Sequence, residues 1–191
     1  MYRLYFKRIF DIILSINLIV ILLPVLISIF FLVWIFIGFP IFLQNRPGLN
    51  GEVFTIYKFK TLYELGEHES ETKRQSSLGN FLRKTGLDEL PQLFNILQNS
   101  MSFVGPRPLL MEYLSKYSKY EKQRHLVKPG MIGLAQLKGS LLGIKSWKKS
   151  IRLDIFYVNN LSFLLDIKIM IMTIKLILVG KKQYKDYKKS L

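Results

Sequence analysis

Hydrophobic positions are concentrated at the two ends of the chain, and the middle is more polar. No charged side chain occurs from residue 12 to residue 44, between Asp11 and Arg46. As one straight helix this stretch would be about 50 Å long, whereas a bilayer core is about 30 Å thick. Pro24 interrupts it, and proline removes a helical hydrogen bond and bends the helix. The pattern predicts a membrane element over residues 1–44.

Three arrangements of this element compete. A cleaved signal peptide fits poorly, because the apolar run is too long and no small-residue cleavage site follows it. A single tilted transmembrane helix is the arrangement that hydropathy alone favours. A re-entrant helix–break–helix enters and leaves by the same face, and basic residues on both flanks favour it because cytoplasmic flanks attract Lys and Arg. These residues are Arg3, Lys7 and Arg8 before the stretch, then Arg46, Lys58 and Lys60 after it.

A second apolar stretch runs from Leu161 to Val179 and contains Asp166, Lys168 and Lys175. Each charge at bilayer depth costs ~2.5–3.5 kcal/mol on insertion scales. The pattern therefore favours an amphipathic helix that lies flat in the membrane interface over one that spans the membrane. The Lys-rich residues 181–189 would suit anionic headgroups. A buried core helix followed by a solvated tail fits these residues nearly as well.

Residues 45–160 contain frequent Gly and Pro and several dense polar motifs. Only residues 53–60 show a short strand-like alternation, so we expect an α+β domain that is predominantly helical. The sequence thus predicts three parts: a membrane helix over residues 1–44, a catalytic domain over residues 45–160, and an interfacial helix with a basic tail over residues 161–191.

Composition narrows the range of partners. The chain has 28 Lys and Arg against 13 Asp and Glu, and its formal net charge is +15. Such a chain is expected to contact nucleic acid, an anionic membrane or phosphorylated substrates. We expect no nucleic-acid partner, because the basic residues are spread among membrane-like segments without a recognition module. The absence of Cys excludes disulfides and thiolate chemistry, and the two histidines, His68 and His125, are interpreted as ordinary surface or core residues.

The candidate chemistry lies around Asp88 and Glu89, just before a helix that Pro91 begins. The simplest explanation for this acidic pair is capping and dipole neutralisation, worth ~0.3–1 kcal/mol per charge. Arg83 and Arg107 favour a second one, because Arg suits bidentate contacts to phosphate. A carboxylate nucleophile, a second carboxylate and phosphate-binding cations together suit phosphoryl transfer, and Mg²⁺ prefers such oxygen ligands.

The chain resembles the bacterial sugar transferases, the monotopic polyprenyl-phosphate phosphoglycosyl transferases. The resemblance covers nearly the whole chain and rests on motifs in the same order and with similar spacing. These motifs are Tyr5-Phe-Lys-Arg-Ile-Phe-Asp11, Tyr57-Lys-Phe-Lys-Thr61, Leu87-Asp-Glu-Leu-Pro-Gln92, Met101-Ser-Phe-Val-Gly-Pro-Arg-Pro108, Pro129-Gly-Met-Ile-Gly-Leu-Ala-Gln136 and Leu153-Asp-Ile-Phe-Tyr-Val-Asn159.

The resemblance implies a re-entrant helix broken at Pro24 and a catalytic domain on the cytoplasmic face of the bacterial inner membrane, against the inner leaflet. It implies that Asp88 attacks the sugar-bearing phosphate of a UDP-sugar and releases UMP. Undecaprenyl phosphate then takes the phosphosugar, giving a polyprenyl diphosphosugar in the first membrane step of glycan synthesis. By position Glu89 would act as a base or as a partner of Mg²⁺. Asp88 and Glu89 together would bind this metal ion. Further residues implied for this site are Lys58, Arg83 and Arg107 for phosphates, and Asp154 in an unassigned role.

The sequence departs from the family pattern at Leu23, Ser100, Ile132 and Ser140, and none of these positions belongs to the acidic pair. A homo-oligomer is compatible with the sequence. The competing functional hypothesis is a non-catalytic, basic membrane-surface scaffold of a glycan-assembly complex, which would need neither Asp88 nor Glu89.

Overall fold

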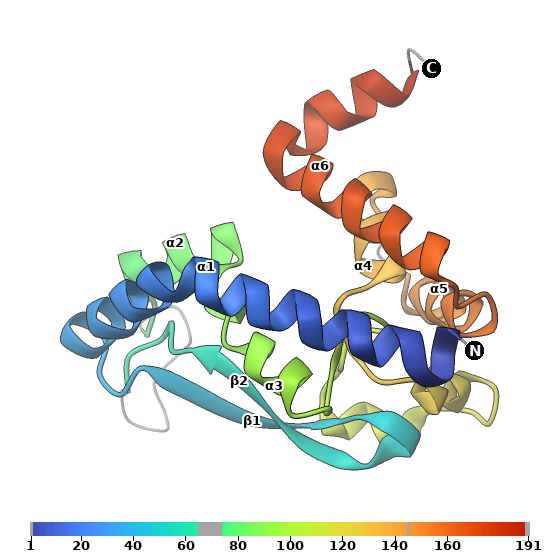
Figure 1. The fold of residues 1–191 in the computed structure, drawn as a ribbon, viewed down its shortest axis with the longest axis horizontal. Coiled ribbons are helices and arrows are strands. Elements are labelled where there is room, and N and C mark those ends of the chain that lie inside the picture. Colours follow the sequence, from blue (N-terminus) through green and yellow to red (C-terminus); the bar gives the residue numbers. More distant parts are fainter. Residues whose placement is uncertain (1, 65–73, 145, 190–191) are drawn as a thin grey trace. The chain divides into compact units, whose positions relative to one another are not determined.

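A computed structural model describes residues 2–64, 74–144 and 146–189, and it is predominantly helical with short strands, as expected. The first half contains a π-helical turn (Tyr2–Phe6), α1 (Lys7–Phe36), β1 (Ile41–Pro47), β2 (Val53–Phe59), α2 (Ser77–Thr85) and α3 (Gln92–Leu97) (Figure 1). The second half contains β3 (Ser102–Val104), β4 (Gly130–Ile132), α4 (Leu134–Leu142), α5 (Trp147–Asn159) and α6 (Phe163–Lys189). Short 3-10 turns occupy Leu49–Gly51, Leu87–Glu89, Met111–Lys116 and Glu121–Leu126.

The chain forms two compact units. Unit 1 contains Met1–Asp11, Arg46–Phe54 and Ser100–Leu191, and unit 2 contains Ile12–Asn45 and Thr55–Asn99. The boundaries fall inside α1, β1 and β2, so the units do not follow the predicted three-part division of the chain. That division concerns the membrane and stays a prediction.

The helix α1 is long and apolar enough to cross a membrane, and it is the one such helix among the described residues. Most of its large apolar side chains are exposed; Val20, Ile21 and Ile35, for example, are 66%, 69% and 73% exposed. A helix with so much exposed apolar surface is compatible with membrane association. The helix continues through Pro24, where the Ser28 hydroxyl donates to the Pro24 carbonyl at 2.8 Å. The re-entrant arrangement stays a prediction.

One face of α1 forms the core of unit 2. Leu26, Ile29 and Val33 follow each other at helical spacing and are buried in a cluster with Phe59 of β2 and Leu82 of α2. Burial of apolar side chains of this size stabilises a fold by roughly 1.5–3 kcal/mol each.

The buried Asn95 ties α3 to β2 within the same unit. Its amide nitrogen donates to the Thr55 carbonyl at 2.7 Å, and its side-chain oxygen accepts from the Tyr57 backbone N–H at 2.9 Å. The Asn95 side chain therefore makes the kind of backbone hydrogen bonds to β2 that a neighbouring strand would make. These bonds fix the segment that follows the turn carrying Asp88 and Glu89.

Unit 1 is built around a short parallel pair of strands that the sequence did not indicate. β3 and β4 pair with Ser102 opposite Gly130 and Val104 opposite Ile132. The backbones approach so closely that a Cβ on Gly130 would lie 2.0 Å from the Gly105 nitrogen. Glycine is required here for lack of space, and the contact sets the start of the loop that carries Arg107.

The polar start of α6 is buried inside unit 1. The Asp166 carboxylate accepts from the Lys7 ammonium at 2.5 Å and from the Tyr2 hydroxyl at 2.6 Å, and it lies 2.7 Å from the Tyr157 hydroxyl. Asp166 is only 1% exposed. Groups of the protein therefore neutralise the Asp166 charge. Because this carboxylate is buried in protein, the free-energy cost of placing a charge in lipid, which the sequence suggested, does not apply to it.

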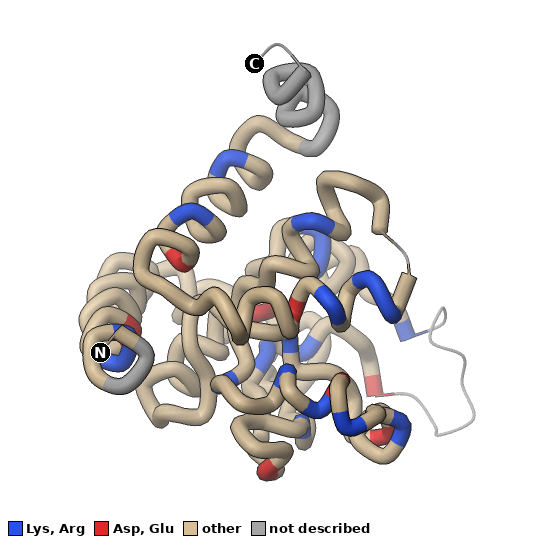
Figure 2. Tube along the Cα trace, turned by 90° about the vertical axis from the view of Figure 1, so that its right-hand side faces the viewer, with Lys and Arg blue, Asp and Glu red and all other residues tan. Residues whose placement is uncertain are grey.

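Farther along, α6 presents apolar side chains to its surroundings. Ile174, Ile177 and Leu178 are 52%, 70% and 79% exposed, and Figure 2 shows few charged turns along the helix before its grey end. The helix is interrupted at Gly180, whose φ is 76°. The side chains of residues 181–189, on which the expected headgroup contact depends, lie outside the described ones.

The close approach of β3 and β4 generates a stability prediction. Gly130→Ala should lower the free energy of unfolding by about 1–3 kcal/mol, because the added methyl group must displace backbone atoms of Gly105. Thermal unfolding of the detergent-solubilised protein, followed by circular dichroism, measures the change.

Gly139→Ala is the matched control, because Gly139 lies inside α4 and the nearest atom to an added Cβ is 3.6 Å away. This variant should be as stable as the wild type or up to about 1 kcal/mol more stable, since Ala favours the helix. An unchanged melting temperature in Gly130→Ala would contradict the tight crossing.

Candidate active site

The acidic pair lies on a 3-10 turn between α2 and α3 in unit 2. Gly86 ends α2 in the left-handed conformation with φ 75°, and the Glu89 N–H donates back to the Gly86 carbonyl at 3.1 Å. The cap position of α3 is occupied by Pro91, which has no side-chain acceptor, so neither carboxylate caps this helix from that position. Asp88 and Glu89 are both half-buried.

Lys58 of β2 is paired with the acidic turn. Its ammonium lies 2.7 Å from Glu89 Oε1, and the two side chains are 18% and 16% exposed. This geometry brings together residues that are 31 positions apart in sequence. The pair is only partly exposed, so salt screens its attraction less than that of a fully exposed ion pair.

Arg83 lies on the exposed face of α2 in the same unit. Its Nε donates to the Thr61 hydroxyl at 2.8 Å, which links α2 to the residues that follow β2. Four of the predicted site residues, Lys58, Arg83, Asp88 and Glu89, thus belong to unit 2.

The other two predicted residues, Arg107 and Asp154, belong to unit 1, where a residue that the sequence did not single out connects them. The buried Arg124 donates from Nε and Nη2 to Asp154 Oδ2 at 3.0 and 2.8 Å, and from Nη2 to the Arg107 carbonyl at 2.7 Å. Asp154 therefore acts on Arg107 through Arg124, as a residue that positions the loop. Burial raises the pKa of the Asp154 carboxyl, and the Arg124 guanidinium opposes this rise.

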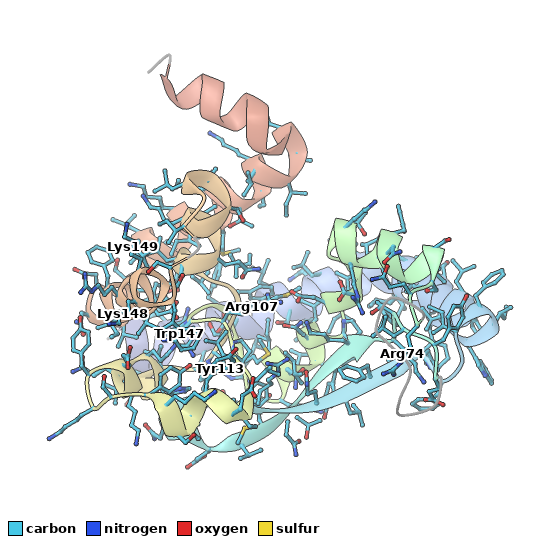
Figure 3. All side chains as sticks on the ribbon, turned by 180° about the vertical axis from the view of Figure 1, so that it is seen from behind. Arg74, Arg107, Tyr113, Trp147, Lys148 and Lys149 are labelled. Atoms are coloured by element: carbon cyan, nitrogen blue, oxygen red, sulfur yellow. The ribbon has the colours of Figure 1, made fainter. Side chains whose placement is uncertain are left out.

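These residues line a cavity of about 460 Å³ in unit 1. Arg107, Arg124 and Asp154 supply its charged wall, and Gln136, Ser140 and Trp147 are among its other lining residues. Trp147 packs on Tyr113, with ring centroids 4.8 Å apart, and Figure 3 shows both together with Arg107. The departure from the family pattern at Ser140 thus lies in the wall of this cavity.

A second cavity, of about 530 Å³, lies in unit 2 and is mostly apolar. Its walls come from α1, β1, β2 and α3, and they include Pro91, which is three residues beyond Asp88. Leu23, another departure from the family pattern, also lines it.

The described residues contain no group of three or more His, Cys, Asp or Glu side chains that could hold a metal ion. Asp88 and Glu89 can supply two carboxylates. This donor set fits Mg²⁺, which is commonly bound through one or two carboxylates together with substrate phosphates and water.

His125 is a core histidine, one of the two ordinary roles expected from sequence, and His68 lies outside the described residues. The Nδ1 atom of His125 is 3.1 Å from the Gly48 carbonyl oxygen, so this nitrogen carries the proton that is donated to the carbonyl. Burial, with a smaller contribution from the Arg124 charge, lowers the pKa of His125. The ring is therefore neutral at pH 7.

Comparison with known proteins identifies the class. Residues 2–180 match the model of a family described as bacterial sugar transferase. The uncharacterized sugar transferase EpsL of Bacillus subtilis is 41% identical over 180 residues, which cover 92% of this chain and 88% of EpsL. The chain therefore belongs to the bacterial sugar transferase family, as the sequence motifs indicated.

Two relatives with more specific names are longer. The UDP-glucose:undecaprenyl-phosphate glucose-1-phosphate transferase of Klebsiella pneumoniae is 35% identical over 195 residues, which cover 95% of this chain and 42% of the relative. The galactosyl transferase CpsE of Streptococcus agalactiae is 38% identical over 160 residues, which cover 75% of this chain and 35% of CpsE. The chain thus spans less than half the length of these two relatives.

The buried His125 generates a prediction about pH. In the unfolded chain its pKa returns to about 6.5, so the unfolded chain takes up the proton first as the pH falls. Stability should therefore decrease as the pH falls below about 6.5. His125→Asn should flatten this decrease, because Asn keeps an N–H for the Gly48 carbonyl but does not titrate. Melting temperatures between pH 8 and pH 5 measure the slopes, and parallel curves for the two proteins would contradict the assignment.

Proposed function

We propose that this chain transfers a sugar-1-phosphate from a UDP-sugar to undecaprenyl phosphate, releases UMP, and does so at the inner leaflet of the bacterial cytoplasmic membrane. Family membership and the names of the relatives support the class of reaction. The observation that carries the proposal is the half-buried Asp88 next to Glu89, whose carboxylate is held by Lys58 at 2.7 Å.

In the first step an Asp88 carboxylate oxygen attacks the phosphorus that bears the sugar. A bond forms between that oxygen and phosphorus, and the bond from phosphorus to the oxygen bridging the two phosphates breaks. UMP leaves with the bridging oxygen and the electron pair, and the sugar phosphate stays on Asp88 as an acyl phosphate. UMP is a good leaving group and needs no proton to depart. This suits the acidic turn, which contains no histidine that could act as an acid.

In the second step a phosphate oxygen of undecaprenyl phosphate attacks the same phosphorus and releases the Asp88 carboxylate. The lipid then carries the diphosphosugar. The apolar cavity of unit 2 supports this acceptor, because it is lined by the membrane-compatible α1 and reaches Pro91 beside the acidic turn. An isoprenoid chain in this cavity would remain in apolar surroundings while its phosphate faces the turn.

The remaining residues position and neutralise phosphates. Glu89, fixed by Lys58, serves as a second oxygen donor beside Asp88, and Mg²⁺ would offset the negative charge of the phosphates when bound by these carboxylates. Arg83 lies in the same unit and Arg107 in the other, and their phosphate contacts stay predictions from the resemblance.

The test of the proposed function is Asp88→Asn. UMP release from a panel of UDP-sugars, with undecaprenyl phosphate and Mg²⁺ in detergent, should fall on the order of 10³-fold or more, because the amide is not a nucleophile. Glu112→Gln removes an exposed carboxylate and should retain full release.

Full UMP release by Asp88→Asn would refute the covalent mechanism. If wild-type protein shown to be folded and lipid-bound releases no UMP across the panel, and cells tolerate loss of both carboxylates, the scaffold hypothesis takes its place.

The Lys58–Glu89 pair generates a second prediction. Lys58→Gln and Glu89→Gln should each lower kcat/KM for UMP release by about 10- to 100-fold, and the double variant should cost little more than either single one, because each removes the same pair. Lys60→Gln is the control, since Lys60 pairs with the exposed Glu64 instead. Additive losses in the double variant would show that the two residues act separately.

A further inference from the structure

The side chain of Asn95, which is 1% exposed, lies at one edge of β2. It donates to the Thr55 carbonyl at 2.7 Å and accepts from the Tyr57 N–H at 2.9 Å. Backbone groups two residues apart in a strand point to the same edge. The Lys60 N–H, at an odd spacing from Tyr57, donates instead to the Pro40 carbonyl beside β1 at 2.8 Å. Asn95 therefore contacts the edge of β2 that faces away from β1.

Asn95 and Glu89 belong to one helical segment of unit 2. Between the 3-10 turn and α3, Leu90 has φ −54° and ψ −36°, and Pro91 has φ −60° and ψ −16°, so no extended residue separates them. A helical backbone of this kind moves as one body. The segment is thus attached to β2 at two points, by Asn95 at the backbone and by the ion pair of Glu89 with Lys58.

The two attachments differ in how precisely they hold β2. Lys58 has a flexible four-carbon stem, so its ion pair with Glu89 tolerates movement of the backbone. Asn95 has a short side chain and bonds backbone groups directly, so it fixes which residues of β2 lie opposite α3. The apolar packing of Phe59 in the core of unit 2 cannot do this, because hydrophobic burial is non-directional. Side chains alternate along a strand, and a slip of one residue would turn Lys58 away from the acidic turn.

We propose that Asn95 is a positioning residue of the candidate active site, whose two hydrogen bonds to β2 fix the register in which Lys58 meets Glu89. Asn95 then acts on the reaction through this ion pair, which holds the second carboxylate beside Asp88. The role rests on the proposed function, because that function makes the orientation of Glu89 matter for catalysis. Without the two hydrogen bonds β2 would stay packed in the core, but the ion pair would be formed for only part of the time.

The first measurement needs no turnover. The detergent-solubilised full chain is acetylated with acetic anhydride, and mass spectrometry gives the labelling rate of Lys58 relative to Lys149, which is exposed on α5 in unit 1. Asn95→Leu removes both hydrogen bonds at similar side-chain size. It should raise the relative rate about threefold or more, toward that of Glu89→Gln, because the ion pair opens more often. This result stands whether or not the protein releases UMP.

The second measurement is a double-mutant cycle on kcat/KM for UMP release. Asn95→Leu alone should lower kcat/KM about tenfold or more, up to the loss caused by Lys58→Gln. In the Lys58→Gln background the same substitution should cost less than about twofold, because the pair that Asn95 positions is already absent. A merely structural role would cost the same factor in both backgrounds. Asn95→Ala, which adds no bulk, repeats both measurements in case the leucine variant does not fold.

Ile96→Val is the matched control, because it removes one methyl group from the neighbouring buried position of α3 and leaves the Asn95 side chain in place. It should change neither the labelling of Lys58 nor kcat/KM.

Three outcomes would overturn the proposal. The first is an unchanged labelling rate of Lys58 in Asn95→Leu. The second is an equal loss of kcat/KM from this substitution with and without Lys58. The third is the same rise in labelling in Ile96→Val, which would reduce the effect to a general loosening of α3. If the wild type releases no UMP, the proposed function fails, and the labelling rates alone decide for or against the role of Asn95.

Discussion

A carboxylate taken out of water without a partner costs several kcal/mol, and this constraint organises unit 1. Asp11, Asp154 and Asp166 are at most 4% exposed, and each accepts hydrogen bonds from a distant part of the chain. Asp11 holds the Phe103 backbone, 92 positions away, and Asp166 holds Lys7, 159 positions away. These hydrogen bonds join segments that are far apart in the sequence, so the buried charges contribute to which segments meet.

The carboxylates of the acidic turn in unit 2 are less buried than those of unit 1. Asp88 and Glu89 are only half-buried, and Glu89 is held by one ammonium that is itself 18% exposed. Carboxylates that remain partly accessible can exchange protein partners for metal and phosphate, whereas Asp154 is locked against Arg124. The degree of burial thus separates carboxylates that build the structure from carboxylates that are suited to chemistry.

The sequence predicted the elements whose signal is local. The apolar α1, the helical content and the family motifs around Asp88 could all be read from continuous stretches. The strands β3 and β4 were missed because each has three residues and their pairing depends on the close approach of Gly105 and Gly130. Arg124 was missed for the same reason, since its importance comes from Asp154 and the Arg107 carbonyl, which no spacing in the chain reveals.

The two cavities that α1 helps to line differ in the chemistry of their walls. Lys7, Arg8 and Asp11 face a cavity of unit 1, whereas Leu23, Leu26 and further apolar residues of α1 line the cavity of unit 2. A phosphate gains nothing in the second cavity, whose lining is mostly apolar. The distribution of charged and apolar side chains along one helix therefore gives the two cavities walls of different chemistry.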